Sequence, residues 1–215
     1  GMNDVRDLHS VAIRILARME YVTIQVDRFF GVGKNRRDTD FVSVLHLEFS
    51  ECLVEGLLTV ALRQIEAERL DDAIVTVRQT LPLAGVLGRL CHHPCEQGCR
   101  RGNWDSPAAI RDMERFVTDQ DFKQPGPHAP SRKRATGKSV VIIGAGPTGL
   151  AAAYYLSREG HQVTVADRRE QAGGTLRDLK EDLLPASVLD AEIALMQRLG
   201  VEFKMNVALG NAVRL

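Results

Sequence analysis

Several features that would narrow the function are missing from this 215-residue chain. The formal net charge at pH 7 is zero, which argues against a general nucleic-acid binder or membrane-surface binder. No apolar run approaches ~20 residues, so the sequence predicts no transmembrane helix. The first residues lack the basic and apolar regions of a secretion signal. We therefore expect a cytoplasmic protein, with Gly1 as a scar left by tag removal.

Cysteine is scarce, and its placement is uneven. The four cysteines are Cys52, Cys91, Cys95 and Cys99, and the last three form a C-x3-C-x3-C motif. Without an export signal, disulfides are not expected. Thiolates suit iron–sulfur clusters and zinc, and four of them allow one cubane cluster. The spacing leaves three alternatives open: a cluster, a zinc site that uses His92 or His93 as a substitute ligand, and plain buried thiols.

A second concentrated signal occupies residues 139–167. Val140–Ile143 is a short β-branched run, typical of a strand that is buried on both faces. Thr148–Arg158 predicts a helix that Gly160 ends, and Val163–Ala166 predicts the next strand. The order is strand, turn, helix, strand, as in a dinucleotide-binding unit.

Three glycines with G-x-G-x-x-G spacing connect the first strand to the helix. Gly144 permits the tight turn, Gly146 lets the backbone approach a pyrophosphate, and Gly149 lets the helix pack on the strand. Phosphates would then lie over the helix N-terminus. Asp167, 18 residues after Gly149, is placed to accept hydrogen bonds from an adenosine ribose. The alternative is a structural glycine turn that binds nothing.

The rest of the chain predicts a mainly helical N-terminal domain, residues 1–120. Apolar spacing indicates helices over 3–20 and 41–69, and another from near Asp71 to before Pro82. Ser106 and Pro107 look like the start of a further helix, with Ile110, Met113, Phe116 and Val117 as its inner stripe. Residues 21–30 are ambiguous between strand and helix. Residues 121–138 hold three prolines and five basic residues, which predicts a linker before residues 139–215.

The motifs in combination resemble a known family. Residues 87–102, followed by 106–116, resemble the N-terminal iron–sulfur domain of the glutamate synthase small subunit, and the N-terminal part of dihydropyrimidine dehydrogenase is similar. Those proteins continue with a linker and an FAD-binding glycine motif, the same order as here. Gly173-Gly174 and residues 184–193 and 199–203 also resemble that family's FAD domain. The resemblance covers roughly residues 50–210.

The resemblance implies an α/β protein. It would have a helical iron–sulfur domain, then a partial Rossmann-like FAD-binding unit of three parallel strands in β-α-β-α-β order. The implied FAD-binding residues are Gly144, Ala145, Gly146, Pro147, Thr148, Gly149, Asp167, Arg168 and Gly174.

The resemblance also implies metal ligands. The family usually holds two [4Fe-4S] clusters, and an upstream cysteine run that serves them is reduced here to Cys52, with Leu53 in place of the usual proline. We expect one [4Fe-4S] cluster on Cys52, Cys91 and Cys95, with Cys99 as the fourth ligand. The rival is Glu114, because the family can use a non-cysteine ligand on the following helix. Zinc is the less favoured alternative.

One departure limits the function that can be assigned. The family continues with an NADPH domain, whereas this sequence stops at Leu215 without a second glycine fingerprint. No residue qualifies as a hydride-transfer catalyst. We expect an electron-transfer flavoprotein subunit of an NAD(P)H oxidoreductase, with the NAD(P)H site outside this chain. A larger oxidoreductase subunit or a second copy would be its partner. The alternative is a non-catalytic iron–sulfur or zinc docking module, or a truncated remnant, that assembles with a larger oxidoreductase.

Overall fold

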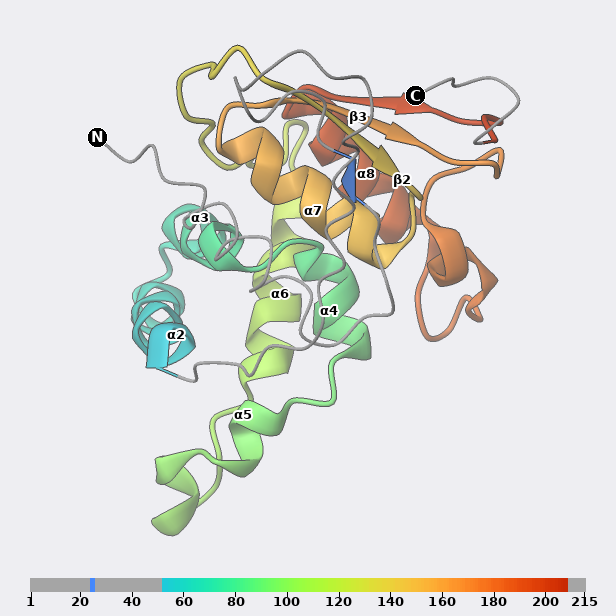
Figure 1. The fold of residues 1–215 in the computed structure, drawn as a ribbon. Coiled ribbons are helices and arrows are strands. Elements are labelled where there is room, and N and C mark those ends of the chain that lie inside the picture. Colours follow the sequence, from blue (N-terminus) through green and yellow to red (C-terminus); the bar gives the residue numbers. More distant parts are fainter. Residues whose placement is uncertain (1–23, 26–51, 209–215) are drawn as a thin grey trace. The chain divides into compact units, whose positions relative to one another are not determined.

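A computed structural model describes residues 24–25 and 52–208, shown in Figure 1. The helix expected over 3–20 and the first part of the one expected over 41–69 lie outside these residues. The described chain divides into two compact units. One comprises residues 24–25, 131–178 and 196–208, and the other comprises 52–130 and 179–195. Each unit is described by itself.

The first unit contains the predicted α/β motif. Its strands are β1 (Ile24–Gln25), β2 (Ser139–Ile143), β3 (Gln162–Ala166) and β4 (Val201–Lys204), in the order β1-β2-β3-β4. The last three are parallel, as predicted. The short β1 lies in the ambiguous stretch 21–30 and pairs antiparallel with β2. Val140 and Ile142 are buried, whereas Val141 and Ile143 on the other face are only partly covered.

Helix α7 (Pro147–Arg158) connects β2 to β3. Four consecutive small or apolar residues, Leu150–Ala153, are buried in it and allow close packing. Gly160 has φ +92°, and a Cβ there would lie 2.2 Å from the Arg134 carbonyl oxygen. Glycine therefore ends this helix as predicted, because a side chain would need both an unfavourable φ and space that the backbone occupies.

The second unit is helical. Its elements are α2 (Cys52–Glu66), α3 (Leu70–Thr80), α4 (Ala84–Leu90), α5 (Pro94–Gln97), the 3-10 turn η1 (Arg100–Asn103), α6 (Ile110–Phe122) and most of α8 (Ala186–Arg198). Helix α2 packs on α3, and α4 packs on α6. Two small clusters form its core, one of Ala61, Val77 and Ala84, the other of Ala73, Ile74 and Val117. None of the described helices is long and apolar enough to cross a membrane.

The start of α6 differs from the sequence prediction. Ser106 and Pro107 precede the helix, which begins at Ile110. Asp105 accepts a hydrogen bond from the Ser106 N–H at 2.6 Å and is itself bound by Arg101, so this segment is held in a turn. Phe116 was predicted to face inward but is 44% exposed, whereas Ile110 and Val117 are buried. The helix also extends through Phe122, two residues into the predicted linker.

Candidate functional site

The α/β unit contains a cavity of about 280 Å³ at the carboxyl ends of β2 and β3. Every predicted FAD-binding residue except Ala145 lines it. Three further lining residues are Ile143, Arg169 and Thr175. Position at the carboxyl ends of parallel strands is the usual place for a nucleotide in such sheets.

Two of the glycines that line the cavity, Gly149 and Gly174, have no room for side chains. A Cβ on Gly149 would lie 1.9 Å from the Gly144 carbonyl oxygen, and one on Gly174 would lie 2.6 Å from the Gly146 Cα. Gly144 has φ +104°, which favours glycine. A Cβ on Gly146, in contrast, would meet nothing within 4 Å. The backbone at Gly146 therefore faces open space where a pyrophosphate fits.

Helix α7 begins beside this turn. Pro147 takes its first position, Gly146 precedes it, and no side chain caps its first turn. Free amide groups and the helix dipole make such an N-terminus attractive to phosphate. The residues present therefore fit the pyrophosphate of a dinucleotide.

Asp167 braces the glycine turn. Its Oδ2 accepts a hydrogen bond from the Ala145 N–H at 2.6 Å, and its Oδ1 accepts one from the Arg169 N–H at 2.8 Å. Ala145 thus belongs to the site through its amide, although it does not line the cavity. Each carboxylate oxygen keeps further acceptor capacity, so the predicted contact to ribose hydroxyls stays available.

An ion pair that the sequence reasoning missed fixes the opposite wall, the 3-10 turn η2 (Gly174–Asp178). Arg169 donates to the Gly174 carbonyl at 2.8 Å and binds both carboxylate oxygens of Asp178, at 3.2 and 3.1 Å. This pairing raises the pKa of Arg169. The Gly173 N–H also donates to the Ala145 carbonyl at 2.8 Å, so the residue before η2 is hydrogen-bonded directly to the glycine turn. In the sequence, the basic Arg169 and the acidic Asp178 stand on either side of Gly173-Gly174, and this opposite charge could have indicated the ion pair.

The helical unit carries the cysteine segment. Cys91 follows α4, Cys95 lies on α5, and Cys99 precedes η1, and neither α5 nor η1 contains a buried residue. Figure 1 shows α5 on a hairpin that extends beyond α4 and α6. Cys52 begins α2, but its side chain is outside the described part of the structure. Among the described residues, no three His, Cys, Asp or Glu side chains are grouped to hold a metal.

Cys95 and Cys99 differ in the direction in which their surroundings shift the thiol pKa. Partial covering of its thiol, followed by the negative charges of Glu114, Cys91 and Glu96, raises the pKa of Cys95, although the residue as a whole is exposed. Burial and Glu96 raise the pKa of Glu114 to about 7. The negative charges of these neighbours therefore disfavour the thiolate form of Cys95.

Cys99 has different surroundings. Hydrogen bonds from the backbone at Ala108 and Arg101 lower its pKa. Of the two candidate zinc ligands, His92 is exposed, and His93 lies 3.8 Å from Glu96 through Nε2 and Oε2. The His93 N–H donates to the Cys91 sulfur at 3.4 Å.

Both parts of the chain match known families. Residues 49–125 match the family described as dihydropyrimidine dehydrogenase domain II, 4Fe-4S cluster. Residues 142–198 match the NAD(P)-binding Rossmann-like domain. The two matches follow one another in the order predicted from the motifs.

Curated relatives span both regions. They include the beta subunit of NADP(+)-dependent formate dehydrogenase from Moorella thermoacetica, 39% identical over 68% of this chain and 24% of that protein. The PreT subunit of NAD-dependent dihydropyrimidine dehydrogenase from Escherichia coli K12 is 38% identical over 72% of this chain and 38% of its own length. The glutamate synthase [NADPH] small chain of Mycobacterium tuberculosis is 36% identical over 66% of this chain and 29% of its own.

The chain thus spans between about a quarter and two fifths of the length of these relatives. Each relative is named as a subunit or chain of an oxidoreductase or synthase that uses a nicotinamide cofactor. With its iron–sulfur segment followed by its Rossmann-like segment, this chain is similar along both segments to the oxidoreductase small subunits that include glutamate synthase small chains and PreT.

Proposed function

We propose that this chain is an electron-transfer subunit of an NAD(P)H oxidoreductase that passes electrons between FAD and one [4Fe-4S] cluster. Flavin exchanges electron pairs with a nicotinamide and single electrons with a cluster, so it supplies the conversion between the two. The protein's own part is to bind and orient both groups.

One observation carries the FAD half of this proposal. At Gly149 and Gly174 a single Cβ would lie 1.9 and 2.6 Å from neighbouring backbone atoms, so the cradle exists only with glycine at both positions. Gly146 and the start of α7 would hold the pyrophosphate, and Asp167 and Arg168 would face the adenosine. The open space over Gly146 leaves room for that pyrophosphate.

For the cluster we propose Cys52, Cys91 and Cys95 as ligands. The fourth ligand is Cys99 or Glu114. Two observations support Glu114: its negative charge contributes to the raised pKa of Cys95, and its carboxylate has no hydrogen bond or ion pair among the described residues. Cys99 is instead stabilised by backbone groups at Ala108 and Arg101.

We further propose that this subunit works with a larger oxidoreductase subunit or with a second copy of itself, in the cytoplasm. The named relatives are subunits of such assemblies, which supports a partner. The NAD(P)H site would lie outside this chain, because the glycine cradle described above is assigned to FAD.

The proposal is tested by an absorption spectrum of protein purified without oxygen, with iron, sulfide and zinc assayed on the same sample. We expect flavin bands, a broad shoulder near ~400 nm, and about four irons per chain. Cluster content in Glu114→Ala and Cys99→Ser would then identify the fourth ligand.

A colourless protein that also fails reconstitution with iron, sulfide and FAD would contradict the proposal. It would favour the docking module instead, and zinc content would show whether the cysteines bind any metal. Iron without flavin would refute the FAD half alone.

A further inference from the structure

The helical unit buries three charged side chains that neither cofactor site uses. Arg78 is 2% exposed, Asp121 5% and Glu192 2%. Burying a charge is costly unless it is paired and hydrogen-bonded. Each of these charged groups therefore needs partners whose interactions offset the free-energy cost of its burial.

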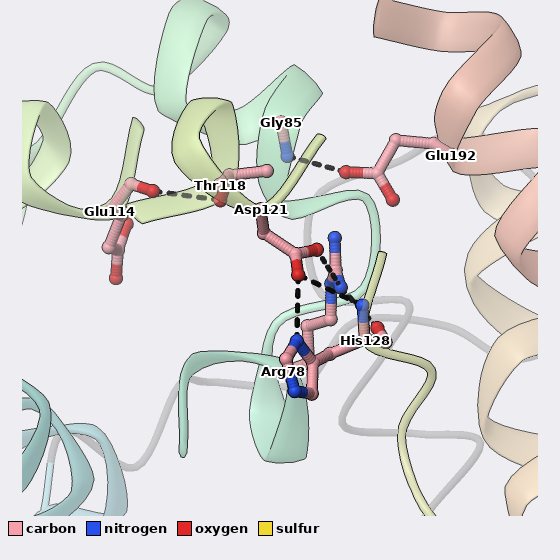
Figure 2. Close-up of polar contacts among 7 residues, drawn as sticks. All are labelled: Arg78, Gly85, Glu114, Thr118, Asp121, His128 and Glu192. Carbon is pink, nitrogen blue, oxygen red and sulfur yellow. Dashed lines mark hydrogen bonds and ion pairs between the residues drawn. The ribbon is translucent and has the colours of Figure 1, made fainter. Parts of the chain in front are cut away.

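Arg78 and Asp121 account for each other. The Arg78 guanidinium binds Asp121 at 2.5 Å and also donates to the His128 carbonyl. Asp121 accepts the His128 N–H at 2.9 Å and lies 2.9 Å from His128 Nδ1 (Figure 2). This cluster fastens the chain that follows α6.

Glu192 of α8 has a different partner. Its Oε1 accepts a hydrogen bond from the Gly85 N–H at 2.5 Å, as Figure 2 shows. Gly85 is the second residue of α4, where backbone amides have no partner within the helix. The residue before α4, Leu83, makes no side-chain cap. Glu192 therefore does from another helix what a capping residue normally does.

The side chains around Gly85 leave no space for a larger residue at this position. A Cβ there would lie 2.8 Å from Phe122 Cε2 and 3.0 Å from Glu192 Oε1. Glycine thus lets the carboxyl group approach the start of α4. Burial raises the pKa of Glu192, while the Gly85 hydrogen bond and Arg78 lower it.

The other end of α4 is Cys91. The helix has only seven residues, and the Cys91 N–H closes its last turn by donating to the Leu87 carbonyl at 2.9 Å. A helix of two turns is not stable alone, so the placement of α4 depends on tertiary contacts such as the hydrogen bond between Gly85 and Glu192.

We propose that Glu192 is a positioning residue for the cysteine site: it fixes the first turn of α4, and α4 fixes Cys91. This inference rests on the proposed function, because it takes Cys91 as a cluster ligand. Glu192 touches neither the cluster nor the dinucleotide.

The test compares Glu192→Ala with Glu192→Gln and Leu189→Ala in the full chain. Gln keeps an oxygen acceptor for the Gly85 N–H. Leu189 is a control on the same helix: it is 1% exposed, and its apolar side chain has no acceptor for the Gly85 N–H. The readouts are the rate of iron release to a ferrous chelator from the reconstituted protein, and hydrogen exchange over residues 84–91 in cluster-free protein.

We expect Glu192→Ala to release iron about tenfold faster and to exchange faster over 84–91. Glu192→Gln should stay within about twofold of wild type in both readouts. Leu189→Ala should lower the stability of the whole chain, without a larger effect on residues 84–91 than on the rest of it. Gly85→Ala, which forces a methyl group against the carboxyl oxygen, should match Glu192→Ala and serves if that variant does not fold.

Equal effects of Glu192→Ala and Leu189→Ala on both readouts would overturn the inference, as would wild-type exchange over 84–91 in Gly85→Ala. Wild-type protein that takes up no cluster would refute the proposed function before any variant is compared. Exchange over 84–91 would still decide the role of Glu192.

Discussion

The dinucleotide pocket and the cysteine segment are built on different principles. The pocket is made largely of backbone: two adjoining glycine turns, a helix N-terminus and a carboxylate that holds an amide. The cysteine segment presents side chains from exposed short elements with no buried residue of their own. The walls of the pocket are formed by the fold itself, whereas the described cysteines are not grouped as they would be around a metal.

This difference has a physical origin. A backbone cradle is fixed once its strand, turn and helix form, because hydrogen bonds and close packing determine every atom. Partial burial and the negative charge of Glu114 disfavour the thiolate form of Cys95, and metal binding requires that form. We therefore expect the pocket to be preorganised and the cysteine site to form together with its cluster.

The largest expected effect comes from Gly149→Val in the pocket. The new side chain would collide with the Gly144 carbonyl, where even a Cβ would lie 1.9 Å away. We expect loss of FAD binding by more than ~100-fold and destabilisation by about 3 kcal/mol. Isothermal titration with FAD and urea unfolding measure the two effects.

Gly146→Ala is the matched control. Its Cβ would meet nothing within 4 Å, so unfolding should stay close to wild type while FAD affinity falls, because the methyl group occupies the pyrophosphate's space. Unchanged FAD affinity in Gly146→Ala would show that the pyrophosphate binds elsewhere.

The second expected effect concerns the cysteine segment. Cys95→Ser should lose most of the iron after reconstitution, because it removes one of the proposed thiolate ligands of the cluster. Stability of the cluster-free protein should change by less than ~0.5 kcal/mol, since Cys95 is exposed. Iron assay and urea unfolding test this contrast with the pocket. A large loss of stability in Cys95→Ser would mean that this segment is preorganised after all.

A smaller effect is expected at the wall of the pocket. Arg169→Gln and Asp178→Asn each remove the bidentate pair that fixes η2, and should weaken FAD binding about threefold, because exposed ion pairs contribute little. The two changes together should weaken binding no more than either alone, as expected for residues that act as a pair. Additive losses in the double variant would show that Arg169 acts on the ligand directly.

The smallest effect is on pH dependence. Burial, and then the charge of Lys138, lower the pKa of His161 below its ordinary value of 6.5. The unfolded chain therefore binds this proton more readily, and stability is lost as the pH falls through about 6.5. Between pH 7.5 and 5.5 wild type should lose up to about 1.4 kcal/mol more than His161→Gln. Parallel pH profiles in urea unfolding would contradict this assignment.

The sequence was most informative where the backbone makes the site. The strand–turn–helix order and the positions of Gly144, Gly149 and Gly160 could be predicted, because each depends on local geometry. The start of α6 could not, because the pairing of Asp105 with Arg101 keeps Ser106 in a turn. Rules for helix capping consider only the residues at the helix start, and they do not include a neighbouring side chain, such as Asp105, that binds the backbone there.

The partners of the buried charged residues also could not be predicted from the sequence. Glu192 stands among Val188, Leu189, Leu195 and Met196, all buried, at the spacing of an apolar helix face. A charged residue at such a position signals a specific partner, but only the tertiary structure shows that the partner is Gly85. The same holds for Arg78, which lies next to the buried Val77.

Both a flavin and a cluster should bind to this one chain. The most direct test is an anaerobic reductive titration of the reconstituted protein, followed by absorption and by EPR spectroscopy. We predict uptake of about three electrons per chain, two by the flavin and one by the cluster. Uptake of two electrons with flavin bands alone, or of one with cluster bands alone, would contradict the account.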